Sequence, residues 1–245
     1  MSRLSLLAAT FVLACATQAW AGDGAEEHHA PDMVAEFGVV IEYYTAQGCV
    51  ACPPVDAHFA TLADRPDVIA LALHVDYWDY IGWKDRFAKA AFTERQRAYA
   101  RRAGSNTIYT PQMIIGGIDR VQGFKPMAVA DLLIRHAAGQ PTVALRLDRD
   151  GIHLDIGAEA DPPLGHEVSV QIVRYKPAET MRIESGENSG RRNTFRNIVT
   201  SWKEIGRWNG EDSLSLRTTA EGSEPIVVIL QQAGHGAILA AGRLR

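Results

Sequence analysis

The sequence predicts an α/β fold in its first half and a mainly β, sandwich-like segment in its second half. Three observations lead to this prediction. Residues 38–44 form a β-branched and aromatic run directly before Cys49 and Cys52, and such a run favours a strand. Residues 68–75 are almost continuously apolar, as expected for a central strand that is buried on both faces. After residue 140 the pattern changes to short, mostly alternating strands.

The segment after the two cysteines predicts a first helix. Its apolar side chains recur at helical spacing and a proline ends the pattern, at Val55, Phe59, Leu62 and Pro66. Aromatic and polar residues, 76–84, follow the central strand and open an insertion. Within this insertion Thr93 and Gln96 have the spacing of a capping box, which predicts a helix that ends near Gly104.

A hairpin and a last helix complete the first half. Residues 108–115 are expected to form a strand, and Gly116-Gly117 predicts a turn into a second strand over 118–121. Pro126 suits the first position of a helix that ends at Gly139. The predicted order is therefore strand, Cys pair, helix, strand, helical insertion, strand, strand, helix.

The second half is expected to be mainly β. Strands are predicted at residues 143–147, 152–156, 168–173, 214–217, 226–230 and 238–244. The irregular spacing of the turns between them favours a small sandwich. We therefore expect one domain over residues 36–140 and a β-rich domain over 141–245.

The first 21 residues have the pattern of a secretory signal peptide. Arg3 precedes an apolar stretch, and Ala19-Trp20-Ala21 fits a cleavage site. The stretch is shorter than the roughly 20 apolar residues of a membrane span. A lipoprotein site at Cys15 is the less favoured alternative. Residues 22–35 are expected to form a flexible tail, and the mature protein is expected in the periplasm or outside the cell.

Composition and cysteine count narrow the classes of function. The formal net charge of −4 argues against a nucleic-acid partner, which would favour a basic surface. No later apolar run is long enough to cross a membrane, and no cofactor motif is recognisable. Cleavage would leave only Cys49 and Cys52, in a compartment where disulfides persist. The pair is then a local bridge, a redox centre or part of a metal site.

Two thiols at this spacing can carry out disulfide exchange. One thiolate attacks a disulfide, and the second thiol resolves the mixed disulfide. Pro53-Pro54 favours a helix that starts at Pro53, which leaves Cys49 in the loop before it. No Lys, Arg or His lies within five residues of Cys49 to stabilise its thiolate.

At this point the chain resembles the thioredoxin superfamily. It is most similar to a bacterial family of exported proteins of undetermined function, with a thioredoxin-like domain followed by a β-rich domain. The resemblance covers essentially the whole mature chain. The segments that carry it are Tyr44 to Pro54 around the Cys pair, His74 to Asp85, Tyr109 to Met113, and Gly186-Glu187-Asn188.

The resemblance implies roles for individual residues. Cys49 would be the nucleophile and Cys52 the resolving thiol of a thiol–disulfide oxidoreductase. Pro111 would be a cis-proline that faces the disulfide, and Thr110 would offer backbone groups to an extended substrate. The chain departs from the superfamily in its Cys-Val-Ala-Cys motif and in the aromatic insertion before Pro111.

Several other segments leave alternatives open. Tyr77 and Trp78 would line the groove around the disulfide, or pack the insertion against the second domain. The turn over 186–190, bracketed by arginines (Arg182, Arg191, Arg192 and Arg196), is expected to be a solvated hairpin rather than an anion site. Gly234-His235-Gly236 is expected to be a turn.

Three classes of function remain. The preferred one is an exported thiol–disulfide oxidoreductase that acts on a protein or a small thiol. The second is a non-catalytic binding or assembly module in which Cys49–Cys52 is a structural bridge. The third is periplasmic copper or other metal handling, by the two thiolates with His74 or His58.

Overall fold

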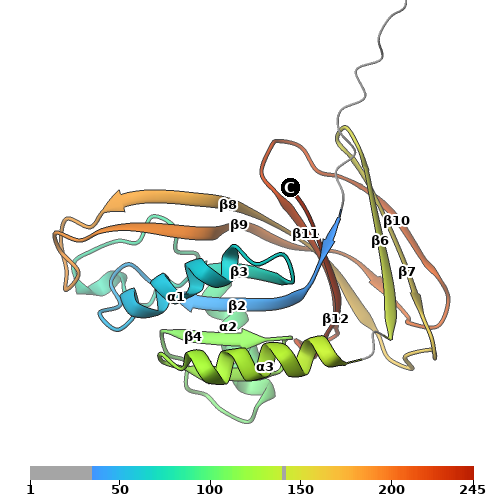
Figure 1. Cartoon of the computed structure of the whole chain (residues 1–245), viewed down its shortest axis with the longest axis horizontal. Coiled ribbons are helices and arrows are strands. Elements are labelled where there is room, and N and C mark those ends of the chain that lie inside the picture. Colours follow the sequence, from blue (N-terminus) through green and yellow to red (C-terminus); the bar gives the residue numbers. More distant parts are fainter. Residues whose placement is uncertain (1–34, 140–141) are drawn as a thin grey trace, which may run out of the picture. The chain divides into compact units, whose positions relative to one another are not determined.

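The structure is a computed structural model that describes residues 35–139 and 142–245. The expected signal peptide (1–21), Cys15 and all but the last residue of the expected tail (22–35) lie outside the described residues. Those described belong to one compact unit, residues 33–245. The fold is mixed α/β, with a large β-rich sheet and few helices (Figure 1).

The main sheet has nine strands in the order β1-β12-β11-β8-β9-β3-β2-β4-β5. A second sheet has three strands in the order β10-β7-β6. The strands from the first half are β1 (Glu36–Phe37), β2 (Val39–Thr45), β3 (Val68–His74), β4 (Gln112–Ile115) and β5 (Asp119–Gln122). The later strands are β6 (Val143–Asp150), β7 (His153–Ala160), β8 (Val168–Arg182), β9 (Arg192–Trp208), β10 (Leu214–Thr219), β11 (Ile226–Gln232) and β12 (Ile238–Leu244).

Three α-helices cover the two faces of the β2–β5 part of the sheet (Figure 1). They are α1 (Pro53–Ala63), α2 (Ala90–Arg102) and α3 (Pro126–Ala138). Apolar residues of α1 and α3 share one core cluster with β2 to β5, and those of α2 share the cluster of the opposite face. A third cluster lies between the three-stranded sheet and β8, β11 and β12.

β2 and β3 lie in the centre of the sheet because their sequences are apolar on both faces. Every residue of β3 is buried, and it runs parallel to β2 with Thr45 opposite His74. Parallel strands with helices on both faces require such two-sided burial. The carboxyl ends of the two strands therefore lie side by side, and the polar loops that follow them meet at one end of the sheet.

The sheet continues across the boundary expected near residue 140. β3 from the first half pairs in parallel with β9 from the second half, with Ala72 opposite Ile198. The division into two domains stays a prediction, and what the hydrogen bonds show is one sheet that joins the two segments. Residues 140–141 themselves lie outside the described part.

Most elements expected from local patterns are present, although the strand expected over 108–115 begins only at Gln112 and the short β1 was not predicted. Two further differences concern the insertion helix and β9. The helix of the insertion begins at Ala90, so Thr93 and Gln96 do not form its capping box. Both side chains are buried and point away from solvent, since Thr93 donates to Asp76 and Gln96 donates to Gln112. The second difference is β9, a 17-residue strand for which no strand was predicted.

Among the helices of the described residues, none is long and apolar enough to cross a membrane.

Candidate functional site

The two cysteines form a disulfide in the loop between β2 and α1. The loop turns twice, with Cys49 N–H donating to the Ala46 carbonyl and Cys52 N–H to the Cys49 carbonyl. The Cα atoms of Cys49 and Cys52 are 5.4 Å apart across the disulfide. Helix α1 begins at Pro53, so the prediction that Cys49 precedes the helix is confirmed.

The disulfide is covered, although the loop between its cysteines is exposed. Cys49 is 1% exposed and Cys52 is fully buried, whereas Val50 is 52% exposed. Solvent therefore reaches Val50 and Ala51 but scarcely reaches the two cysteines. A group that attacks Cys49 needs the loop or its cover to move.

The N-terminus of α1 has few free donors for a thiolate. A helix normally leaves its first four N–H groups unpaired. Here Pro53 and Pro54 have no N–H, and the N–H groups of Val55 and Asp56 both donate to the Cys52 carbonyl. The first turn of α1 therefore has no free N–H group to donate to a Cys49 thiolate. The contribution of this helix to stabilising the thiolate is its dipole.

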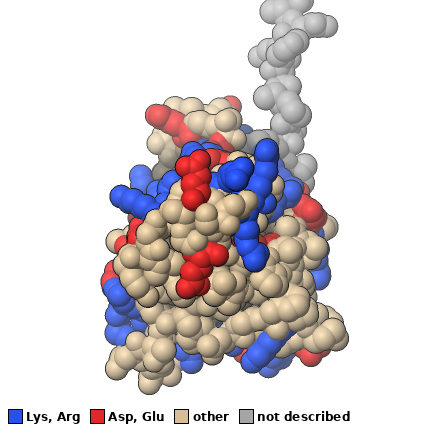
Figure 2. Space-filling view, turned by 90° about the vertical axis from the view of Figure 1, so that its left-hand side faces the viewer, with Lys and Arg blue, Asp and Glu red and all other residues tan. Residues whose placement is uncertain are grey.

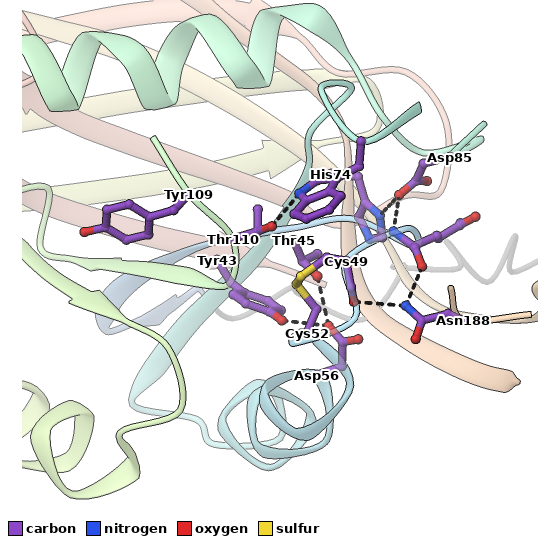
Figure 3. Close-up of a disulfide and its surroundings, with 12 residues drawn as sticks. Tyr43, Thr45, Cys49, Cys52, Asp56, His74, Asp85, Tyr109, Thr110 and Asn188 are labelled. Atoms are coloured by element: carbon purple, nitrogen blue, oxygen red, sulfur yellow. Dashed lines mark hydrogen bonds and ion pairs between the residues drawn. A yellow bond between two sulfur atoms is a disulfide. The ribbon is translucent and has the colours of Figure 1, made fainter. Parts of the chain in front are cut away.

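Asp56 lies one turn along α1 from Cys52 (Figure 3). Its carboxylate oxygen Oδ1 accepts hydrogen bonds from Tyr43 (2.8 Å) and Thr45 (3.1 Å), both on β2. Burial raises the pKa of Asp56, and the hydrogen bond from Tyr43 partly offsets this rise. Burial raises the pKa of Tyr43 as well, so the phenol remains a donor. The hydrogen bonds of Asp56 with Tyr43 and Thr45 therefore join α1 to β2 next to the Cys loop.

Thr110 and Pro111 stand at the same end of the sheet as the Cys pair. Gln112, the first residue of β4, pairs with Tyr44 near the end of β2. The Thr110–Pro111 peptide bond is cis, the isomer that the resemblance implies. The structure thus brings the two segments together at the carboxyl end of β2, from opposite sides of a long stretch of sequence.

Trp78 connects these two segments. Its indole Nε1 donates to Thr110 Oγ1 at 2.7 Å. Its Cβ would lie 3.4 Å from a Cβ added at Gly48. Tyr77 donates from its hydroxyl to Gln96 on α2 at 3.2 Å. Burial raises the pKa of Tyr77 to about 12, and hydrogen bonds with Gln96 and Thr110 partly offset this rise. Both aromatic residues therefore lie near Thr110, and Trp78 also lies near Gly48 of the Cys loop.

His74 and Asp85 form a buried pair behind the Cys loop. His74 Nδ1 and the backbone N–H of Gln47 both contact Asp85 Oδ2, at 2.7 and 2.8 Å. His74 Nε2 has no hydrogen-bond partner among the described residues. Two phenylalanine rings, Phe87 and Phe195, meet the imidazole edge-on. His74 therefore reaches the loop through Asp85 and Gln47.

The metal alternative finds no ligand set in the part of the chain that the structure describes. No group of three or more His, Cys, Asp or Glu residues there is arranged to hold a metal ion. His58 lies on α1 with its ring against Phe124, and burial lowers its pKa.

Asn188 is a site residue that sequence analysis did not single out. It lies in the turn between β8 and β9, and its Nδ2 donates to the carbonyls of Gln47 and Cys49, each at 2.9 Å. The arginines around this turn face solvent, apart from Arg196, which pairs with Asp64. The turn is thus not simply solvated. The family resemblance includes Gly186-Glu187-Asn188 among its matching segments, and this match is the sequence signal that points to Asn188.

Comparison with known families places the chain. Residues 40–231 match the family DUF1223, described as a protein of unknown function. The chain belongs to this family. A search of curated proteins gives no significant match. The family assignment agrees with the expected likeness to proteins of undetermined function, and it brings no activity with it.

The solved structures that resemble this DUF1223 protein include the following two. One is a crystal structure of a protein from Agrobacterium tumefaciens, with a TM-score of 0.71 and 28% identity, over 84% of this chain and 93% of that one. The other is HBP35 of Porphyromonas gingivalis, with a TM-score of 0.60 and 13% identity, over 85% of this chain and 74% of that one. At 13% identity the second likeness concerns the fold alone.

Proposed function

We propose that this protein is an exported thiol–disulfide oxidoreductase that works through Cys49 and Cys52. The observation that carries the proposal is the Cys49–Cys52 disulfide, at the junction of β2 and α1 and at the same end of the sheet as Thr110 and the cis Pro111. A disulfide at this position is compatible with a redox role. Periplasmic or extracellular location is part of the proposal, because disulfides persist there.

A thioredoxin-like arrangement of residues 36–140 is also part of the proposal. The order β2, α1, β3, α2, β4, β5, α3 supports it, as does the placement of α1 and α3 on one face and α2 on the other. The disulfide then occupies the loop that enters the first helix. The later strands extend the same sheet and add a cover to it.

The proposed reaction is a pair of thiol–disulfide exchanges. A substrate thiolate attacks Cys49 Sγ, the Cys49–Cys52 bond breaks, and Cys52 leaves with the electron pair as a thiolate. A second substrate thiolate then attacks the sulfur joined to Cys49 and releases Cys49 as a thiolate. The substrate dithiol has become a disulfide, and the protein has gained two electrons and two protons. In the other direction Cys49 attacks and Cys52 resolves.

The surroundings of the disulfide suit a polypeptide or a small thiol as substrate. Thr110 would present its backbone to an extended segment, and Trp78 and Tyr77 would form one wall beside it. Figure 2 looks onto the end of the sheet where β2 ends, and the lower middle part of this face is largely free of charged side chains. A substrate with uncharged groups next to its sulfur fits such a surface.

Trapping of mixed disulfides tests the proposal. A Cys52→Ser variant lacks the resolving thiol, so it should accumulate covalent complexes through Cys49 when exposed to disulfide substrates. The matched Cys49→Ser variant keeps one thiol in nearly the same place and should trap little. Absence of complexes with Cys52→Ser, together with a pair that resists reduction, would exclude the oxidoreductase.

One observation favours the second candidate, a structural bridge in a non-catalytic binding or assembly module. Both cysteines are buried, and the loop that holds them is hydrogen-bonded on several sides. A redox titration separates the candidates. Structural disulfides have reduction potentials below about −300 mV, and exchange-active pairs are higher.

A further inference from the structure

The second half of the chain contacts the backbone of the disulfide loop through a buried side chain, Asn188, and Met181 also accepts a hydrogen bond from the Gln47 side chain. Asn188 is 2% exposed, and its amide nitrogen donates to both the Gln47 and the Cys49 carbonyl. Figure 3 shows the amide between these two carbonyls and the end of the β8–β9 hairpin. The orientation of the amide follows from its partners, because only the NH₂ group can donate to two carbonyl oxygens.

This arrangement leaves part of Asn188 unsatisfied. Its Oδ1 is buried and has no partner among the described residues. A buried acceptor without a hydrogen bond costs free energy, and such groups in folded proteins call for an explanation. The explanation we favour is that the position serves the Cys loop, with both donors of the amide committed to it, rather than the stability of the hairpin.

The turn that carries Asn188 is joined to the aromatic insertion. Ser185 Oγ donates to the Gly82 carbonyl at 2.6 Å, and Trp83 Nε1 donates to the side-chain oxygen of Gln47 at 2.6 Å. Gly186 has φ of +77°, and a Cβ at this residue would lie 3.3 Å from Trp83. Gln47, which lies two residues before Cys49, is therefore hydrogen-bonded both by the turn over residues 183–191 and by the insertion.

We infer that Asn188 is a positioning residue that keeps the disulfide loop closed, so that the β8–β9 turn controls access of thiols to Cys49. The inference rests on the proposed function, since it concerns regulation of the same site. Cys49 is buried, so a thiolate can reach its Sγ only after the loop moves. That movement breaks the two hydrogen bonds of Asn188. Once they break, attack on Cys49 proceeds with Cys52 as the leaving thiolate.

The sharpest test is Asn188→Asp. This change keeps the shape of the side chain but replaces the two N–H donors by an oxygen that faces two carbonyls. The oxidised variant should be reduced by dithiothreitol about tenfold faster than the parent, the factor that corresponds to roughly 1.4 kcal/mol. The rate is read from labelling of the freed thiols. Dithiothreitol becomes a cyclic disulfide as the protein gains two thiols, so the reaction balances.

Asn197→Asp is the matched control. Asn197 is also a buried asparagine, and its Nδ2 donates to one backbone carbonyl, that of Ala70 within β3, at 2.9 Å. This variant should lose stability without faster reduction. If it accelerates reduction as much as Asn188→Asp does, the effect is general loosening and the inference fails. An unchanged rate in a folded Asn188→Asp protein overturns it as well.

A second variant keeps the inference testable if Asn188→Asp does not fold, as judged by circular dichroism. Trp83→Phe retains an aromatic ring but loses the donor to Gln47, and it should accelerate reduction by a smaller factor. No acceleration in this variant then overturns the inference. Failure of the proposed function gives a different pattern of results. If either variant is reduced faster but Cys52→Ser traps no complexes, Asn188 positions the loop around a structural disulfide and the protein is not an oxidoreductase.

Discussion

Two buried polar regions lie next to β2, one at its middle and one at its end, and they differ in how completely their polar groups are hydrogen-bonded. In the middle of β2, the carboxylate of Glu42 accepts two hydrogen bonds from Arg95, at 2.7 and 2.8 Å, and others from Tyr44 and Tyr99. At the end of β2, around the disulfide, His74 Nε2 and Asn188 Oδ1 have no partner among the described residues. The first region is closed, whereas the second retains unused groups.

The closed region joins the two halves of the chain. Arg95, on α2, also donates to Gln231 on β11, and its guanidinium lies 3.8 Å from the ring centroid of Trp202 on β9. A buried ion pair adds little net stability compared with apolar packing, but it fixes geometry because its partners must meet. The comparison indicates that the Glu42–Arg95 pair fixes the geometry of the sheet and α2. The polar groups at the end of β2 are less completely hydrogen-bonded and can change partners during a reaction.

The largest effect is expected from breaking the closed region. Arg95→Ala leaves Glu42 buried without its counter-charge, which should lower the free energy of unfolding by about 3–5 kcal/mol. Urea denaturation measures the loss. Arg97→Ala on the same helix is the matched control, because Arg97 pairs with Glu94 at the surface and such pairs contribute less than about 1 kcal/mol. Equal losses in the two variants would contradict the assignment of Arg95 to the scaffold.

Reduction of the disulfide should have a smaller effect on stability. The loop that Cys49 and Cys52 close is only a few residues long, so the chain-entropy contribution is about 2 kcal/mol. Urea denaturation with and without dithiothreitol gives the difference. A loss as large as that of Arg95→Ala would mean that the end of β2 is part of the scaffold, and it would favour the structural-bridge candidate.

Local patterns were sufficient to predict much of this scaffold. β2, β3, α1 and α3 are each specified by their own apolar periodicity or by a proline at the first turn, as with Pro126. β9 was missed because its charged and apolar residues follow no single period over 17 residues. The capping box predicted at Thr93 was wrong because the spacing of Thr93 and Gln96 is the same whether Thr93 caps a helix or, as here, is buried and donates to Asp76.

The candidate site could be predicted only in part. Cys49, Cys52, Thr110 and Trp78 lie in segments whose composition stands out, and the fold brings them to one end of the sheet. Their roles, and those of Pro111 and Tyr77 toward a substrate, stay predictions. Asn188 could not be inferred from spacing, because it lies 139 residues from Cys49 in sequence and comes near it through tertiary contacts that include the pairing of β3 with β9.

Trp78→Phe should sharpen the comparison at the disulfide end. The variant keeps an aromatic ring and the Cβ next to Gly48 but loses the donor to Thr110, a hydrogen bond worth about 1 kcal/mol. We expect little loss of global stability and a larger change in the rate of exchange with a cysteine-containing peptide, because the Thr110 segment loses its tie to the Cys loop. Trp208→Phe, whose indole donates to Asp212 far from the disulfide, is the control. Equal changes in exchange rate would contradict a role at the site.

The smallest effect concerns the pH dependence contributed by Asp56. Its pKa is raised above the ordinary 3.8, mainly by burial, so the folded protein holds a proton that the unfolded chain releases. Between these two pKa values stability falls as pH rises, and at neutral pH the whole cost of the buried carboxylate is present. Asp56→Asn removes this titration. Its stability relative to the parent should therefore improve as the pH is raised from about 3 toward 7.

Asp155→Asn should show the opposite sign. Asp155 is exposed, and its hydrogen bonds from Arg217 lower its pKa, so the parent gains from the carboxylate as pH rises and the variant does not. Urea denaturation of both variants over the same pH series measures the two trends together. A difference between Asp56→Asn and the parent that stays constant with pH would show that the pKa of Asp56 is the same in the folded and the unfolded chain, as for a solvated carboxylate without an ion pair. The region of incompletely hydrogen-bonded groups at the end of β2 would then include Asp56. In that case α1 would be held to β2 by ordinary surface hydrogen bonds.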